Sequence, residues 1–382
     1  MNFSLDYEQQ MLQDSVRRFI DKDYPFQARS AQVQTGLAGS AAHWPTFAAN
    51  GWLCAALPEA FGGLGGSIID TVLIAHEFGR GLVLEPFVGS AVLAAQTLVA
   101  AATPAQLDQW VPALADGSRR LALAYSEVQS RGLPQPVQLR ADAVDGGYRL
   151  HGVKTLVLGG ADAAVLIVSA LTAQGVSLFL VDAASSGLSR QALPLHDGSW
   201  AAQVQLDNVW VSSDALLGAP GSGLTALQHG LAHATAALCA ELVGVMEKAI
   251  ELTADYLKIR EQFGMPIGRF QALQHRIADM AADLEMARSM LMALLDSINN
   301  DHADERQLRI SQAKALIGRT AKSVCAQAIQ LHGGIGTSEE CSIGHYYKRA
   351  VVADLLLGHS DRHEALCADY LQATLQPGDR TA

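Results

Sequence analysis

The sequence predicts an α+β protein with three parts: an N-terminal helical domain over residues 1–118, a small central β-domain over residues 119–215, and a C-terminal four-helix bundle over residues 216–382. Two observations lead to this prediction. In the first and last parts, apolar residues recur every three or four positions, which is the period of an amphipathic helix. In the middle part, short segments of alternating polarity are separated by turn residues, which is the pattern of strands.

The N-terminal part is predicted to be helical around one glycine-rich loop. Residues 4–8 give an N-cap signal for a first helix, and residues 44–52 predict a second. The loop, residues 57–67, carries four glycines, which indicates close backbone approach. It has no lysine and no preceding strand, unlike a Walker-type phosphate loop. Two further helices are expected, through Leu98 and over residues 107–114.

The central part has the character of a sheet. Turn signals at residues 145–147 and 197–199 combine aspartate with glycine, residues that favour tight turns. Between the turns lie β-rich segments, which we expect to be strands: residues 120–125, 136–143, 148–152, 164–169, 176–181 and 200–211.

Long helices dominate the C-terminal part. The first apolar pattern runs from Leu224 to residue 259, about 36 residues or roughly 54 Å at ~1.5 Å per residue. The second covers residues 273–298. Gly264, Pro266 and Gly268 interrupt the period between them, so we expect the chain to reverse there. A third helix is expected over residues 305–331, before a glycine pair typical of a C-cap, and a last helix over residues 346–355.

Composition and charge limit the function classes. The net charge of -11 argues against nucleic acid as a main partner. The five cysteines form no C-x-x-C pair, which indicates reduced thiols rather than a metal cage or a disulfide framework. The first 19 residues have no apolar run, and no uninterrupted apolar run of ~20 residues exists, so we expect no signal peptide, no membrane span and a cytoplasmic location.

The elbow between the two long helices carries the most unusual chemistry. Arg260 is expected in the last turn of the first helix, Phe263 and Phe270 flank the break, and Gln271 opens the second helix. An arginine in a last turn can simply complement the helix dipole. Alternatively, its guanidinium and nearby amides can hold a diphosphate. The residues by themselves leave both interpretations open.

The run over residues 260–271, REQFGMPIGRFQ, resembles the R-x-Q-F-G-x-P-I-x-x-F-Q signature of acyl-CoA dehydrogenases. Residues 58–67 resemble the P-E-x-x-G-G-x-G-G-S turn of that family, and residues 330–336 resemble its Q-x-x-G-G-x-G segment. The helix–sheet–helix order agrees, so the resemblance covers nearly the whole chain. It implies the acyl-CoA dehydrogenase fold, FAD as cofactor, α,β-dehydrogenation of an acyl-CoA thioester, and electron-transfer flavoprotein as acceptor.

The resemblance also implies cofactor-binding residues. In this family one FAD lies across a dimer interface, with the flavin ring held by one subunit and the adenine-diphosphate end largely by the other. The residues implied for the adenine-diphosphate end are Arg260, Phe263, Gln271, Gln330, Gly333 and Gly334. On the ring side, Ser126 keeps a hydroxyl that could face the flavin.

The positions that the family uses for chemistry depart from its pattern. Its catalytic glutamate corresponds here to Leu357, and the alternative location early in the first long helix corresponds to Ala234, so no catalytic residue is assigned. Of the T-E-P-x-x-G-S-D motif, only Ser126 and Glu127 are kept in type. The W-I-T-N-G segment is replaced by LVLGG over residues 156–160.

Three hypotheses follow. The first is a subunit that supplies the adenine-diphosphate half of the FAD site but has no base of its own, and that acts with a larger homologous subunit in a heterotetramer. Residues 236–244 and 344–349 resemble small subunits of such bacterial enzymes, of the pimeloyl-CoA dehydrogenase and steroid side-chain type. The second is a self-sufficient enzyme, as a homo-oligomer, with Glu241 or Asp354 as a relocated base. The third is a scaffold without flavin. The first two require an oligomer.

Overall fold

The computed structural model describes residues 5–36, 43–300 and 302–375. Helices precede and follow a central sheet, which confirms the predicted fold class. The chain divides into two compact units. A helical unit contains Met1–Asp23, His76–Leu82 and Leu238–Ala382, and a sheet-containing unit contains Tyr24–Ala75 and Val83–Ala237. The domain boundaries drawn from the sequence at residues 118 and 215 stay predictions.

The first helix, α1 (Tyr7–Asp23), begins with a capping box. The Gln9 amide donates to Asp6 Oδ1 at 2.9 Å, and the Asp6 amide donates to Gln9 Oε1 at 3.1 Å. Two donors without a helical partner are thereby satisfied. The predicted N-cap signal is used at Asp6, whereas Ser4 lies outside the described residues. The other helical segments before the sheet are α2 (Phe26–Gln34), α3 (Trp44–Ala49), η1 (Glu59–Phe61), α4 (Ile68–Gly81), the π-helix η2 (Phe87–Ala94), α5 (Ala95–Ala101) and α6 (Pro104–Ala115).

The glycine-rich loop folds as the sequence predicts, with backbone against backbone. A Cβ on Gly63 would collide with the carbonyl group of Leu57, and one on Gly66 would lie 2.5 Å from the carbonyl oxygen of Ala55. Gly62 has a φ of 95°, in the left-handed region. Close packing at Gly63 and Gly66 and a left-handed backbone at Gly62 therefore account for these glycines without a ligand. Periodicity did not predict α4, which follows this loop, or α2, which precedes α3.

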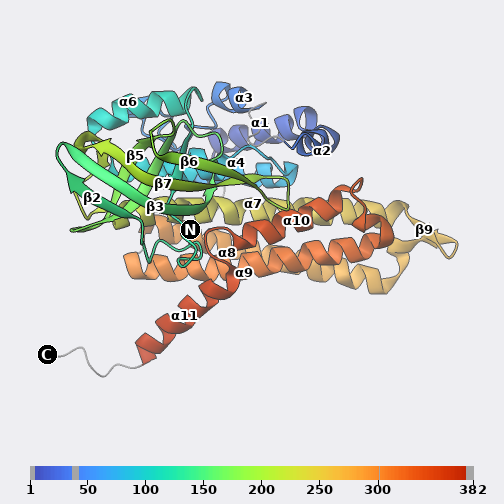
Figure 1. The fold of residues 1–382 in the computed structure, drawn as a ribbon. Helices are drawn as coiled ribbons and strands as arrows, with labels where there is room; N and C mark the ends of the chain where they lie inside the picture. Colours follow the sequence, from blue (N-terminus) through green and yellow to red (C-terminus); the bar gives the residue numbers. More distant parts are fainter. Residues whose placement is uncertain (1–4, 37–42, 301, 376–382) are drawn as a thin grey trace. The chain divides into compact units, whose positions relative to one another are not determined.

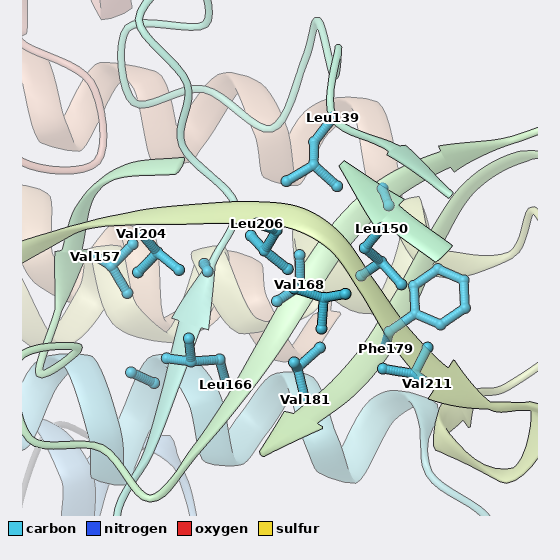
Figure 2. Close-up of a cluster of buried hydrophobic side chains, with 14 of the residues drawn as sticks. Leu139, Leu150, Val157, Leu166, Val168, Phe179, Val181, Val204, Leu206 and Val211 are labelled. Atoms are coloured by element: carbon cyan, nitrogen blue, oxygen red, sulfur yellow. The ribbon is translucent and has the colours of Figure 1, made fainter. Parts of the chain in front are cut away.

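Within the described residues, eight strands form the central sheet, in the order β6-β7-β3-β2-β4-β5-β8, with β1 paired to β4 in parallel. Figure 2 shows part of the buried cluster on this sheet, in which Leu150, Val168 and Phe179 are inaccessible to solvent. The strands are β1 (Leu121–Ala124), β2 (Arg140–Val144), β3 (Gly147–Leu158), β4 (Val165–Thr172), β5 (Gly175–Asp182), β6 (Leu188–Pro194), β7 (Trp200–Ser212) and β8 (Leu216–Leu217).

Two features of the sheet differ from the prediction. β6 and β8 were not expected. β2 begins at Arg140 rather than at residue 136, because the Glu127 carboxylate accepts the amides of Gln138 and Leu139 at 2.9 and 3.1 Å. Those amides are consequently unavailable to a strand ladder.

The long helices follow the predicted order. α7 (Gly223–Ile259) and α8 (Gln271–Asn300) are joined by the hairpin of β9 (Glu261–Gln262) and β10 (Met265–Pro266), then by η4 (Ile267–Arg269). α9 (Ala303–His332) runs into η5 (Gly333–Thr337). Figure 1 shows α8, α9 and α10 side by side, with the hairpin at the end of the helices. The single last helix of the prediction is two helices, α10 (Ser342–Leu355) and α11 (Ser360–Leu375).

α7 is long and apolar enough, by length and composition alone, to cross a membrane, and it is the one helix of this kind among the described residues. Within its most apolar window, 83% of the residues are buried inside the structure. This is the burial of a core helix.

A buried ionic cluster joins α1, α4, α7 and α8 in the helical unit, and His76 lies at its centre. Its Nδ1 lies 3.1 Å from Glu77 Oε1 and its Nε2 lies 3.3 Å from Glu247 Oε2. Arg17 donates to Glu77 at 2.7 Å, and Arg80 pairs with Glu247. Carboxylates only accept, so both contacts of His76 are hydrogen bonds when the ring is an imidazolium.

Three further charged residues extend the cluster: Arg288 pairs with Glu247, and Glu251 pairs with Arg80 and with Lys248. Here α4 and α7 cross in backbone contact, because a Cβ on Gly79 or Gly244 would collide with a carbonyl oxygen of the other helix. Burial alone would lower the pKa of His76. Its hydrogen bonds to Glu247 and Glu77 outweigh burial and raise the pKa above the ordinary value of 6.5.

The stability of the protein is expected to fall as pH rises above neutrality, and His76→Gln should flatten that dependence. A histidine whose folded pKa is raised contributes stability that is complete below about pH 6.5 and is lost as pH passes through the folded pKa. Urea unfolding at pH 6, 7, 8 and 9 measures the effect. His275→Gln, at an exposed position of α8, is the control. An unchanged pH slope in His76→Gln would remove His76 as the titrating group.

Candidate functional site

The elbow after α7 is a tight β-hairpin. Gln262 pairs with Met265, and the Ile267 amide closes the hairpin by donating to the carbonyl oxygen of Arg260 at 2.8 Å. The two turn residues, Phe263 and Gly264, have φ of 55° and 77°. Positive φ at both central positions is the requirement of a type I′ turn. The predicted chain reversal is confirmed, and Gln271 opens α8 as expected.

Phe263 is strained and exposed. A bulky residue with positive φ is a backbone outlier that costs on the order of 1 kcal/mol or more. Its side chain is nevertheless 87% exposed, so burial does not offset that cost. The ring meets Phe270 edge-on with centroids 6.0 Å apart. An exposed aromatic ring on a strained turn is a feature expected of a binding surface.

Arg260 lies one residue beyond the helix rather than in its last turn, and it is exposed. Over the described part of the chain, neither its guanidinium nor that of Arg269 makes a hydrogen bond or an ion pair. Nearby Lys258, by contrast, pairs with Asp255 at 2.9 Å. The elbow thus presents two uncompensated guanidinium groups, which suits an anionic ligand.

The glycine pair after α9 leaves its backbone open. Gly333 has φ 65° and ψ -147°, a conformation that essentially only glycine adopts. A Cβ on Gly333 or Gly334 would meet nothing within 4 Å, so these glycines are not explained by packing. Gln330, one turn earlier, is exposed. A flat ligand or a diphosphate can approach the backbone here.

Side-chain contacts bring the elbow and the glycine pair together. The rings of Tyr256, one turn before Arg260, and His332, next to Gly333, stack with centroids 4.5 Å apart and an interplanar angle of 19°. Arg276 Nη1, in the second turn of α8, donates to Gln327 Oε1 at 3.1 Å. The predicted residues of the adenine-diphosphate half therefore lie around one end of the helical unit. Their unpaired cations, exposed ring and open backbone fit a nucleotide diphosphate.

The residues implied for the flavin ring lie in the sheet unit. Ser126 is 4% exposed, and within the described residues its hydroxyl has no hydrogen-bond partner. Its carbonyl oxygen accepts the Thr155 amide at 2.9 Å. The register of β3 then shifts between Lys154 and Val157, and Leu156 inside this bulge has a φ of 51°. Bulges re-aim side chains beside active sites, and here the side chain presented is a leucine, 38% exposed.

A buried ion pair that sequence reasoning missed supports this region. Lys154 is fully buried, and its Nζ donates to Glu127 Oε1 at 2.6 Å, Ser169 Oγ at 3.0 Å and the Tyr125 carbonyl oxygen at 3.2 Å. Burial lowers the pKa of Lys154 to about 8, although Glu127 opposes that shift. The available signal was a lysine within an apolar strand, which needs a buried partner.

The two positions that the sequence resemblance implies for the family's base, Leu357 and Ala234, are apolar and buried. Leu357 is 6% exposed and has a φ of 58°. Its carbonyl oxygen lies 3.0 Å from His363 Nε2, which holds the turn between α10 and α11. Ala234, in α7, is fully buried. Leu357, Leu156 and Phe263 are three of the six non-glycine residues with positive φ among those described, so the backbone is strained at motif positions even where the side chain differs.

The two carboxylates considered as alternative bases, Glu241 and Asp354, are each held by basic side chains. Glu241 accepts Arg349 Nε at 2.5 Å and Nη2 at 2.9 Å, a bidentate pair that uses both of its oxygens. Asp354 accepts Lys322 Nζ at 2.6 Å and the Ser360 hydroxyl at 3.2 Å, and it lies near buried Lys314. Both candidate carboxylates are therefore engaged by donors of the protein itself.

Helices that precede and follow a central sheet along the chain, together with a cationic elbow and an open glycine turn, define a candidate nucleotide-binding enzyme. Comparison with known proteins gives the family. Residues 6–118 match the model for the N-terminal domain of acyl-CoA dehydrogenase, and residues 221–371 match the C-terminal domain. The chain belongs to the acyl-CoA dehydrogenase family, FAD-dependent oxidoreductases that act on CH–CH bonds.

Individual relatives agree. The chain is 31% identical to 2-methylacyl-CoA dehydrogenase of Solanum tuberosum, over 80% of this chain and 76% of that protein. It is 28% identical to acryloyl-CoA reductase (NADH) of Anaerotignum propionicum, over 96% and 95%. Among solved structures, a steroid ACAD variant is 30% identical with a TM-score of 0.86, over 96% and 98%. The ChsE4-ChsE5 complex of Mycobacterium tuberculosis is 25% identical with a TM-score of 0.87, over 97% and 99%.

Proposed function

We propose that this chain is a subunit of an FAD-dependent acyl-CoA dehydrogenase that supplies the adenine-diphosphate half of a shared FAD site and has no catalytic base of its own. The observation that carries the proposal is that no candidate base in the described part of the chain is left free of a cationic partner. Leu357 fills the family's base position, and Glu241 and Asp354 are each engaged by cations. The nucleotide half, in contrast, presents arginines without partners among the described residues.

Each half of the site has a distinct role in this proposal. Arg260 binds the diphosphate, Phe263 packs on the nucleotide, and the Gly333–Gly334 backbone lies against it, while the partner chain provides the ring pocket and the carboxylate. Bound FAD supplies the acceptor for the hydride from the β-carbon of the thioester. Leu357, an aliphatic side chain, can move no proton.

Partners follow from the same scheme. A chain of the ChsE4-ChsE5 complex, which by its title joins two differently named proteins, has this fold. That likeness supports a larger homologous subunit as the partner, in a heterotetramer. We further propose an acyl-CoA substrate, electron-transfer flavoprotein as the acceptor, and a cytoplasmic location. The small-subunit assignment rests on the sequence resemblance over residues 236–244 and 344–349.

Two observations favour a self-sufficient homo-oligomer as the second candidate. The Ser126 hydroxyl lacks a partner within the described chain, and β3 has a bulge at Leu156. Both features suit a flavin ring in this chain's own sheet unit. A scaffold without flavin, the third candidate, is separated from both by the visible absorption spectrum of the protein purified alone and with its partner.

Arg260→Ala is expected to weaken FAD binding by ~10- to 100-fold in the assembled enzyme without unfolding it, because a charge-assisted contact to a diphosphate contributes about 1.5–3 kcal/mol. Flavin content after gel filtration is the measurement. Arg18→Ala is the matched control: it removes an exposed guanidinium on α1, outside the elbow, that makes no hydrogen bond or ion pair among the described residues. Full occupancy in Arg260→Ala would leave Arg260 as a residue that only complements the helix dipole.

A further inference from the structure

The two pieces of the nucleotide half come from elements far apart in the sequence. The elbow follows α7, and the glycine pair follows α9. Their relative position depends on how the ends of these helices meet. The ends of α7 and α9 are in contact through the stacked rings of Tyr256 and His332, whose centroids lie 4.5 Å apart. Each lies within one helical turn of a residue in the proposed site.

His332 is fixed on its own helix as well. Its Nδ1 lies 2.8 Å from the carbonyl oxygen of Ala328. A carbonyl oxygen only accepts, so Nδ1 carries the proton. Burial lowers the pKa of His332, more than the hydrogen bond to Ala328 raises it. The ring is consequently neutral near pH 7, which removes the desolvation cost of a charged ring packed against Tyr256.

The residue after His332 is Gly333, so the position of the His332 ring and the direction of the backbone beyond the helix are linked. Gly333 leaves the helix with a φ of 65° and a ψ of -147°, so the chain turns sharply at the stacked residue. Tyr256 is connected in the same way to the hairpin, because its carbonyl oxygen accepts the Arg260 amide at 2.9 Å. A change in the stack would shift the Arg260 elbow relative to the Gly333 turn.

We propose that Tyr256 and His332 are positioning residues for the adenine-diphosphate part of FAD: their stack sets the spacing between the Arg260 elbow and the Gly333–Gly334 turn. The proposal rests on the proposed function, and neither ring is assigned contact with the reacting atoms. The ligand class is a nucleoside diphosphate, because the elbow contributes cations and the turn contributes open backbone.

The test distinguishes the contribution of the stacked rings to ligand binding from that of the hydrogen bond between His332 and Ala328. His332→Phe keeps an aromatic ring and loses the bond to Ala328, whereas His332→Leu loses both. Tyr256→Phe removes a hydroxyl that has no partner among the described residues, and Tyr256→Leu removes the ring. In the assembled enzyme, stripped of flavin, we expect both leucine variants to bind FAD about 3- to 10-fold more weakly, and both phenylalanine variants to stay within about 2-fold of wild type.

Ligand choice distinguishes positioning from general destabilisation. ADP contains the diphosphate and adenine, whereas FMN lacks the adenosine half of FAD. The leucine variants should lose affinity for ADP by the same factor as for FAD and keep their affinity for FMN. Their losses should not add in the double variant, because either substitution removes the same stack. If a leucine variant fails to fold, the remaining one and the phenylalanine pair still give the comparison.

Three results would overturn the inference. Wild-type affinity for FAD and ADP in both leucine variants would show that the stack does not set the site. Equal losses for FAD and FMN would assign the stack to stability alone. Binding of neither FAD nor ADP by wild type, alone or assembled, would remove the proposed function itself, and this inference with it.

Discussion

Purified alone and supplied with FAD, this chain is expected to oxidise acyl-CoA at least ~10²-fold more slowly than its assembly with a homologous subunit that carries the glutamate, because loss of a general base costs ~10²- to 10⁴-fold. The structural reason is that Leu357 stands at the base position while Glu241 and Asp354 are held by cations. The measurement is acyl-CoA-dependent reduction of an electron acceptor, with native mass spectrometry to establish which assembly is present.

Three variants make this experiment decisive. Leu357→Glu restores a carboxylate but should not restore the rate, because Leu156 and Leu158 still replace the side chains that hold the ring in the family. Robust turnover by the single chain, abolished by Glu241→Gln or Asp354→Asn, would establish a relocated base and refute the incomplete subunit. A stable monomer under all conditions would contradict cofactor sharing.

Glu241→Gln is expected to destabilise the protein by about 3 kcal/mol, because it breaks a buried, bidentate ion pair and leaves Arg349 without its carboxylate. Urea unfolding near pH 7 measures the loss. Asp361→Asn, in an exposed pair with Arg319, is the matched control and should change stability little, since solvent screens such pairs.

A second substitution separates structure from catalysis at Glu241. Replacing both partners, Glu241→Leu with Arg349→Met, should recover much of the lost stability, because well-packed apolar residues often replace a buried pair without loss. If Glu241 were instead a base, Glu241→Gln would leave the midpoint of unfolding unchanged and reduce only the rate in the assembled enzyme.

Much of the architecture followed from local pattern. The period of apolar residues placed α7, α8 and α9 within a few residues of their bounds, because each helix buries one continuous stripe. Gly264, Pro266 and Gly268 marked the elbow, since they interrupt that stripe. β6 was missed, because five of its seven residues are exposed, so the strand lacks the alternating apolar face by which a half-buried strand is recognised.

The sequence by itself determined the family, through spaced motifs around Arg260 and Gly333 that local backbone chemistry requires. Only the tertiary structure decided which charged groups are available. Arg260 has no partner in the described chain. Glu241 forms an ion pair with Arg349, and Lys154 forms one with Glu127. These outcomes depend on pairs separated by 108 and 27 residues. Periodicity reports which face of an element is buried, whereas the partner of a buried charge is fixed only when distant elements pack.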